Sequence, residues 1–306
     1  MRLDETEQDS VEDRRGEGGF GGGFGLPHAG GLGIGTLIIL GLLGWVLGID
    51  PRVLIGGAEI ISGARHETQA PSPTRRAEKP SDDMSRFVST VVGNINREWT
   101  DIFAQDGKNY TKPVLVLYNQ ATPAGCGGLA QSAMGPFYCP EDRKVYLDTA
   151  FFKDIENRFH GCEAGSTSCQ FTYAYVIAHE IGHHVQNLLG ILPKVQRQQQ
   201  ELDKVSANQL QVRVELQADC FAGVWARHEN ARLQKEGKPP LVDPGDVEAA
   251  MQTASAIGDD TLQRRATGRV VPDSFTHGSG EQRRRWFSTG YREGTPAACN
   301  TFRASS

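Results

Sequence analysis

Five consecutive residues near the middle of the chain, His179-Glu180-Ile181-Gly182-His183, form the pattern HExxH. Residues four apart on a helix lie one turn apart on the same face, so both imidazoles can bind one metal ion at roughly 2.0–2.1 Å. Glu180 lies about 100° round the helix from His179, beside the metal, where it can take a proton from a metal-bound water. This spacing predicts the zinc centre of a hydrolase.

A second run, Glu215-Leu216-Gln217-Ala218-Asp219, supplies what the first lacks. A catalytic zinc keeps three protein ligands and one open position for water, and Glu215 is the predicted third ligand. Asp219, one turn further on, is predicted to accept a hydrogen bond from the outward ring nitrogen of His179, which fixes the tautomer of that ligand. The alternative is that two solvated helices share this spacing by accident.

Both runs lie in segments with helical periodicity. Apolar residues recur with a period of 3.6 along residues 173–189 and again along residues 210–225, and Gly190 is the predicted end of the first helix. His184 points about 100° away from His183, so we do not expect it to bind the metal. Tyr173 and Tyr175 are predicted to be packing residues.

An HExxH motif followed by a glutamate from a later helix is the gluzincin arrangement. The wider context, YAYVIAHEIGHHVQN and then VELQADCFAGVWA, closely resembles the bacterial neutral zinc metallopeptidase family. The resemblance extends to DSVEDRRG near the start, the single apolar anchor, and PDSFTHGSGEQRRRWF near the end. It implies a membrane-anchored zinc peptidase of α+β class, with a mainly helical, thermolysin-like zincin domain that carries a small β-hairpin or sheet.

The N-terminal part of the chain contains a predicted membrane anchor. No Asp, Glu, Lys or Arg occurs between Glu17 and Asp50, and residues 31–49 are near the length of a transmembrane helix, with Trp45 at one end. A cleaved signal peptide is the alternative, but about 30 residues precede the apolar run and no A-x-A site follows.

The few charges around this segment predict its orientation. Arg14 and Arg15 precede it and Arg52 follows, so the positive-inside rule places the N-terminus in the cytoplasm and the catalytic domain outside it, in the periplasm or at the cell surface. The predicted organisation is a disordered Gly-rich cytoplasmic arm (1–30), a single-pass transmembrane helix (31–49), a Pro-rich linker (50–82) and the zinc metallopeptidase domain (83–306).

The cysteines are consistent with an oxidising compartment. Cys126 with Cys139 and Cys162 with Cys169 are close in sequence and are candidate disulfides, although six cysteines allow 15 full pairings. Cys220 follows Asp219 on an apolar helix and is predicted to be a buried small hydrophobe. A second metal site built from the early cysteines is the alternative, but they lack CxxC spacing.

The remaining elements are predicted from apolar patterns. We expect a helix over residues 83–103, a strand over 112–118, and a hairpin with strands at 135–139 and 144–147. The resemblance to zincins implies that one strand of this hairpin pairs with an extended substrate backbone. A hairpin that only covers the core is the equally supported alternative.

His277 is the remaining candidate catalytic residue. It lies in a loop just before a helix that begins near Gly280, where Ser279 and Gln282 form a predicted capping box. An imidazole there could stabilise an oxyanion or contact zinc reversibly, or it could only support the loop. Of the run Arg283-Arg284-Arg285, one residue could pair with a carboxylate near the site. Asp259-Asp260 is predicted to be a polar turn between helices, not a calcium site.

The net charge of −5, without a basic stripe, makes a nucleic-acid partner unexpected. The sequence therefore predicts a membrane-tethered peptidase that binds Zn²⁺ through His179, His183 and Glu215 and uses Glu180 as general base on peptide or protein substrates. Two alternatives remain open. One is a catalytically inactive binding or scaffold domain stabilised by zinc, and the other is a zinc amidase acting on a non-protein amide. The sequence does not predict an oligomeric state.

Overall fold

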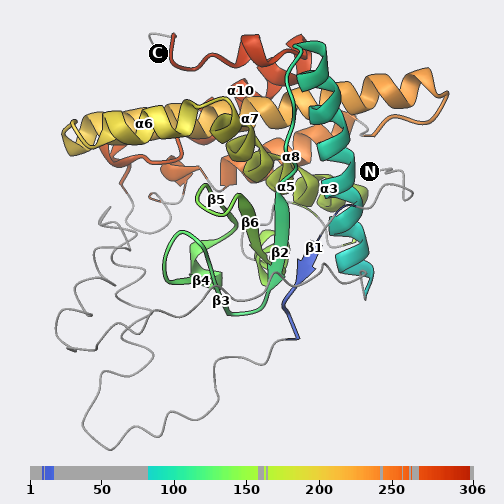
Figure 1. The fold of residues 1–306 in the computed structure, drawn as a ribbon, viewed down its shortest axis with the longest axis horizontal. Helices are drawn as coiled ribbons and strands as arrows, with labels where there is room; N and C mark the ends of the chain where they lie inside the picture. Colours follow the sequence, from blue (N-terminus) through green and yellow to red (C-terminus); the bar gives the residue numbers. More distant parts are fainter. Residues whose placement is uncertain are drawn as a thin grey trace, which may run out of the picture. The chain divides into compact units, whose positions relative to one another are not determined.

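Long helices pack together beside a small sheet in the computed structural model of the 306-residue chain. The structure describes residues 9, 11–16, 82–157, 162, 165–241, 244–256, 258–261, 263 and 269–303. The elements labelled as in Figure 1 are, in chain order, β1 Val11–Asp13, α3 Asp83–Gln105, β2 Val114–Tyr118, β3 Ala121–Pro123, β4 Leu129–Gln131, η1 Ser132–Met134, β5 Phe137–Cys139, β6 Lys144–Asp148, α4 Ala150–Asn157, α5 Thr167–Leu188, α6 Ile191–Gln199, α7 Lys204–Lys235, α8 Pro244–Ala256, η2 Pro272–Ser274, α10 Gly280–Glu293 and η3 Pro296–Cys299.

The two central helices, α5 and α7, begin at capping side chains. Ser166 accepts a hydrogen bond from the backbone N–H of Cys169 at the start of α5, and Asp203 accepts from two backbone N–H groups at the start of α7. Helix α5 ends beside Gly190, whose φ of 73° is left-handed, as the sequence predicts. The apolar residues that repeat with helical period face the core: Ile177, Ile181, Val185, Val214, Ala218, Phe221 and Trp225.

Helices α7 and α10 approach each other closely because glycines face each other across the interface. A Cβ atom at Gly223 would overlap the backbone of Phe287, and a Cβ atom at Gly290 would overlap the backbone of Cys220. Any larger residue at either position would push the helices apart. This contact matters for the site, because α7 carries Glu215 and Asp219 and α10 carries Arg283.

The main sheet has the strand order β1-β2-β6-β5. Strands β1 and β2 are parallel, β2 and β6 are parallel, and β5 pairs antiparallel with β6. The predicted helix at 83–103, strand at 112–118 and hairpin are confirmed as α3, β2 and β5–β6, and Arg143 makes the hairpin turn with a φ of 57°. Strand β5 lies at the edge of the sheet, and α5 packs beside it (Figure 1).

One strand was not expected. Val11–Asp13 falls in the arm predicted to be disordered, but it forms β1 and pairs with Leu115, Val116 and Leu117 of β2. For these residues the prediction of disorder is wrong. The reason is tertiary: Val11 is buried in the core at 4% exposure, and the charged residues after it form ion pairs with Lys144 and Asp82, so the segment gains enough contacts to order.

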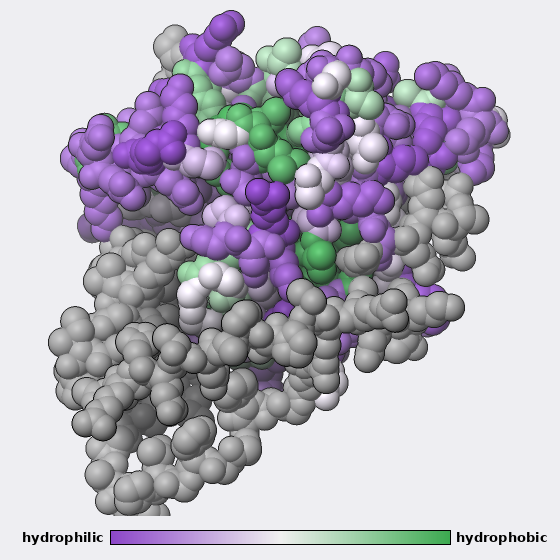
Figure 2. Space-filling model, viewed as in Figure 1, coloured by the Kyte–Doolittle hydropathy of each residue, from purple (hydrophilic) through white to green (hydrophobic). Residues whose placement is uncertain are grey.

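The fold is mixed α+β and mostly helical with small sheets, as the sequence predicts. The predicted transmembrane helix at 31–49 and all but the last residue of the linker at 50–82 lie outside the described residues. Among the residues that are described, no helix combines the length and apolar character needed to span a membrane. The face seen in Figure 2 is largely hydrophilic, with an apolar patch in its upper part.

Candidate metal centre

Helices α5 and α7 bring together His179, His183 and Glu215. The distance from Glu215 Oε2 is 3.2 Å to His179 Nε2 and 3.5 Å to His183 Nε2. One ligand atom from each residue lies within 4.8 Å of the other two. The three side chains are almost buried, with Glu215 and His179 each 7% exposed. The structure therefore gathers at one point the three residues that the sequence predicts as metal ligands.

The geometry fits a tetrahedral zinc. Ligand atoms about 2.0–2.2 Å from such an ion lie about 3.3–3.6 Å apart, close to the observed distances. The Nδ1 atoms face acceptors, Asp219 Oδ1 for His179 and Gln186 Oε1 for His183, each at 2.8 Å. If each imidazole donates its Nδ1 proton to these acceptors, the lone pair of Nε2 is left for a metal ion beside the Glu215 carboxylate. In that tautomer the three ligand atoms could hold a metal ion.

Asp219 is the centre of a buried network behind His179. Arg283 Nε lies 2.9 Å from Asp219 Oδ2, and Arg283 Nη2 lies 3.0 Å from Oδ1. Tyr175 donates its hydroxyl to Asp219 Oδ1 at 2.6 Å. Burial opposes the charge of this carboxylate, but Arg283 and His179 outweigh it and lower the pKa of Asp219 to about 2. The expected contact between Asp219 and His179 is present. Tyr175 is more than a packing residue, because its hydroxyl belongs to this network.

Gln186 holds His183 and was missed by the sequence analysis. Its Oε1 accepts from His183 Nδ1, while its Nε2 donates to the carbonyl of Val214 at 2.8 Å and to Gln217 Oε1 at 3.0 Å. It is fully buried. The only signal in the sequence was its position three residues after His183 on the same helix. This amide ties the α5 ligand to α7, the helix that supplies the third ligand.

Glu180 follows His179 on α5 and lies within electrostatic range of His183. The residue is 7% exposed, and in the part of the chain that the structure describes its carboxylate has no hydrogen-bond or ion-pair partner. Its negative charge contributes to raising the pKa of His183, a shift that burial opposes and Glu215 drives. An unpaired carboxylate next to a metal centre can accept a proton from water.

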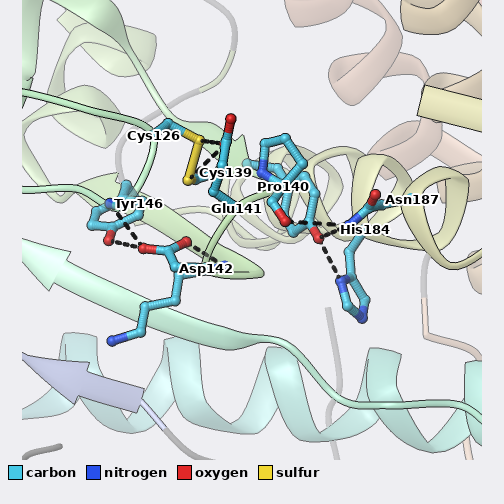
Figure 3. The surroundings of a disulfide bond; sticks show 11 residues. Cys126, Cys139, Pro140, Glu141, Asp142, Tyr146, His184 and Asn187 are labelled. Carbon is cyan, nitrogen blue, oxygen red and sulfur yellow. Dashed lines mark hydrogen bonds between the residues drawn. A yellow bond between two sulfur atoms is a disulfide. The ribbon is translucent and has the colours of Figure 1, made fainter. Parts of the chain in front are cut away.

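His184 faces away from the metal ligands, as expected. Its Nε2 donates to the carbonyl of Thr111 at 2.6 Å, and its Nδ1 accepts from the hydroxyl of Tyr138, 3.0 Å away. Asn187 donates to the same hydroxyl at 2.9 Å. Burial lowers the pKa of His184 to about 4, so the ring is neutral. Figure 3 shows His184 and Asn187 reaching from α5 to the β5–β6 hairpin, which fixes edge strand β5 to the helix that carries the ligands.

His277 is held by a carboxylate that the sequence analysis assigned only to a turn. Asp259 Oδ2 accepts from the backbone N–H groups of Thr276, His277 and Gly278 at 2.6, 2.6 and 3.0 Å, and Oδ1 lies 3.4 Å from His277 Nδ1. Burial lowers the pKa of His277, but Asp259 and Glu215 together raise it. A Cβ atom on Gly278, the next residue, would lie 3.3 Å from Leu216 and Val212, so this loop lies against α7, the helix that carries Glu215. Its side chain is 44% exposed, so it can meet a substrate.

All six cysteines are in disulfides, Cys126–Cys139, Cys162–Cys169 and Cys220–Cys299. The two proposed close pairs are confirmed. The prediction for Cys220 is right about burial and wrong about its chemistry, since its sulfur is bonded to Cys299. Cys126, Cys139 and Glu141 lie close together (Figure 3), but the two sulfurs are bonded to each other, which argues against a second metal site there.

Comparison with known proteins identifies a family and relatives that are similar to this chain over most of its length. The profile of the family described as "Putative neutral zinc metallopeptidase" matches residues 1–302. The uncharacterized protein YpfJ of Escherichia coli (strain K12) is 44% identical over 301 residues, 97% of this chain and 96% of YpfJ. The uncharacterized protein Rv2575 of Mycobacterium tuberculosis (strain H37Rv) is 39% identical over 276 residues, 85% of each chain. No solved structure matches significantly. The similarity therefore includes the arm, the sheet and the helices.

Proposed function

Because the chain belongs to the putative neutral zinc metallopeptidase family, we propose that it is a zinc-dependent peptidase of the gluzincin type. The observation that carries the proposal is the convergence of His179, His183 and Glu215, with the unpaired carboxylate of Glu180 beside them. A zinc site that only stabilises a fold closes all four positions with protein ligands. Among the residues that the structure describes, three ligands converge and the carboxylate of Glu180 beside them has no partner, which favours hydrolysis over a scaffold role.

Each residue around the centre has its own role in the proposed hydrolysis of a peptide bond. Zinc, when bound, supplies the Lewis acidity that such a reaction needs. Glu180 accepts a proton from the attacking water and then delivers it to the leaving amine. His277 donates a hydrogen bond from Nε2 to the carbonyl oxygen as that atom gains negative charge. Asp259 holds the His277 loop by its three backbone hydrogen bonds, so the imidazole needs little reorganisation.

Strand β5 is the proposed binding edge for the substrate backbone. It is the outermost strand of the sheet on the side of α5, and Tyr138 on it is fixed by His184 and Asn187. An extended peptide that pairs with this edge gains main-chain hydrogen bonds without a strict sequence requirement. The proposed substrates are therefore peptides or protein segments in extended conformation. Membrane attachment through residues 31–49 remains a prediction from the sequence.

The proposal is tested by Glu180→Gln in the full chain. We expect this variant to keep one zinc per chain, because Glu180 is not a ligand, and to lose about 10²–10⁴-fold in turnover of a denatured protein substrate. Zinc is measured by elemental analysis and cleavage by release of fluorescent fragments. The matched control is Glu201→Gln, an exposed glutamate between α6 and α7, which should change neither quantity.

Three results would argue against the proposal. Undiminished cleavage by Glu180→Gln would exclude the base assignment. Stoichiometric zinc in the wild type without chelator-sensitive cleavage would favour the scaffold alternative. Hydrolysis of small amides but of no peptide would favour the amidase.

A further inference from the structure

The N-terminal segment forms a strand in the main sheet of the domain that contains the candidate zinc site. Strand β1 extends the sheet beyond β2, in register over three residues, and Val11 is buried in the core (Figure 1). The backbone N–H of Arg14 donates to the carbonyl of Leu117 at 2.8 Å, which continues the pairing by one residue. We call residues 9 and 11–16 the N-terminal clasp.

Polar contacts hold the clasp at its first residue and within β1. Asp9 accepts a hydrogen bond from Asn96 of α3 at 2.9 Å and forms an ion pair with Lys112, also at 2.9 Å. Glu12 forms an ion pair with Lys144 of β6 at 2.7 Å, reaching across β2. These side chains come from three different parts of the domain. The clasp is therefore fixed by tertiary contacts and not only by the strand pairing.

The two arginines of the clasp are held in the same way. Arg14 donates to Thr122 Oγ1 and to the carbonyl of Pro123, each at 3.0 Å. Arg15 pairs with Asp13 at 2.5 Å and with Asp82 at 3.0 Å. These are the two positive charges from which the positive-inside rule predicts a cytoplasmic N-terminus. In the folded chain they bind carboxylates and carbonyls of the domain.

The ion pair between Arg15 and Asp82 joins the two ends of the intervening segment. The atoms are 3.0 Å apart, whereas the hydrocarbon core of a bilayer is about 30 Å thick. A single membrane crossing between these residues would place them on opposite faces. Two crossings need about 40 apolar residues, and the uncharged stretch, residues 18–49, has 32.

We propose that the chain does not cross a membrane between Arg15 and Asp82, so that the N-terminal clasp and the zinc-site domain lie on the same side. Any membrane contact made by the uncharged stretch is then made from that side. This replaces the opposite-side topology that the charge bias predicts. It does not depend on the proposed peptidase activity.

Cysteine labelling of the full chain tests the topology. All six native cysteines are in disulfides, so one added cysteine is the only free thiol. Gly16→Cys reports on the clasp, because Gly16 is exposed and a Cβ there meets no atom within 4 Å. Ser288→Cys, at an exposed position on α10, reports on the domain. Each variant is treated with a membrane-impermeant maleimide in intact spheroplasts and again after lysis.

The proposal requires the two variants to behave alike: both react before lysis, or both react only after it. Labelling of one before lysis and of the other only after it would overturn the proposal.

A charge exchange tests the clasp itself. Glu12→Lys and Lys144→Glu each place like charges together, and each should lower the melting temperature of the full chain by about 2–4 °C. The double variant Glu12→Lys/Lys144→Glu restores an opposite-charge pair and should recover most of the loss. If the losses of the two single variants simply add in the double variant, Glu12 and Lys144 are not in contact, and the proposed attachment of the clasp to the sheet is wrong.

Discussion

At the scale of single residues, the candidate metal centre depends on which ring nitrogen of each histidine is protonated. Asp219 and Gln186 both accept from Nδ1, so both histidines present Nε2 to the same point. The two acceptors differ in charge. The carboxylate behind His179 makes that ring a stronger electron donor than His183, which has only a neutral amide behind it. Arg283 balances the charge of Asp219 and so offsets part of the cost of burying that carboxylate.

Replacing Gln186 tests the support behind His183. Gln186→Met keeps the volume of the side chain but removes the acceptor for Nδ1, so we expect zinc affinity to fall about 10–100-fold. Competition with a chromophoric chelator measures the affinity. The matched control is Gln217→Met, which removes contacts to Gln186 and to the Cys299 carbonyl but leaves the acceptor of His183 in place. Equal losses in the two variants would mean that the buried amides act on stability and not on the ligand.

The ligand residues and the acceptor behind His179 could be predicted from the sequence, and the other supporting residues could not. The spacing of His179 and His183 fixes their common helix face, and Glu215 with Asp219 repeats that spacing on the next long helix. Asp259 holds His277 from 18 positions away, across a turn whose path the sequence does not reveal. Arg283 stands in a run of three arginines, and only the packing of α10 on α7 selects it for burial.

At the scale of elements, α3 and α7 meet at a buried group of charges. Glu98 of α3 pairs with Arg97 at 3.0 Å, and Glu229 of α7 pairs with Arg232 at 2.7 Å. The two acids are 4% and 0% exposed. Burial raises the pKa of Glu98 from 4.5 to about 7, with Glu229 adding to the shift and Arg97 opposing it. This interface therefore holds a proton near neutral pH.

A pH-dependent stability follows from that proton. The pKa of Glu98 is higher in the folded state than in the unfolded state. The proton on Glu98 therefore stabilises the fold fully below pH 4.5, and this stabilisation is lost as the pH rises to about 7. The side chain in Glu98→Gln stays neutral at every pH, so this variant lacks the loss that the wild type shows. The free energy of unfolding of the variant minus that of the wild type should therefore increase between pH 5 and pH 8, by on the order of 3 kcal/mol. Chemical denaturation at the two pH values measures this difference. Asp101→Asn, an exposed acid on the same helix, is the control. Parallel pH profiles for wild type and Glu98→Gln would contradict the assignment.

The long helices could be predicted from apolar periodicity, whereas the short strand β1 could not be predicted without knowledge of its tertiary contacts. The stripes of α3, α5 and α7 repeat over several turns, which identifies them without a partner. Strand β1 has only three residues, of which Val11 alone is apolar and buried, so no pattern marks it as a strand. Its order comes from β2 and from ion pairs with residues more than 60 positions away, such as Asp82 and Lys144. Such contacts are visible only after the chain has folded.

At the scale of the whole molecule, the disulfide between Cys220 and Cys299 joins the centre of the fold to its C-terminal part. Cys220 follows Asp219 on α7, and Cys299 ends η3, 79 residues later. The carbonyl of Cys299 also accepts from Gln217, a neighbour of Gln186. The sequence predicted the burial of Cys220 from its apolar helix, but the choice among possible pairings depends on the three-dimensional path of the chain.

The length of each disulfide loop predicts its contribution to stability. Cross-linking a longer loop removes more entropy from the unfolded chain, about 4–5 kcal/mol for a separation of 79 residues and about 3 kcal/mol for the 13 between Cys126 and Cys139. Cys220→Ala/Cys299→Ala should therefore lose more free energy of unfolding than Cys126→Ala/Cys139→Ala. Guanidinium denaturation of both variants, each saturated with zinc, measures the difference. If the variant lacking the short loop loses as much or more, native contacts around that hairpin, and not chain entropy, determine what the disulfides contribute.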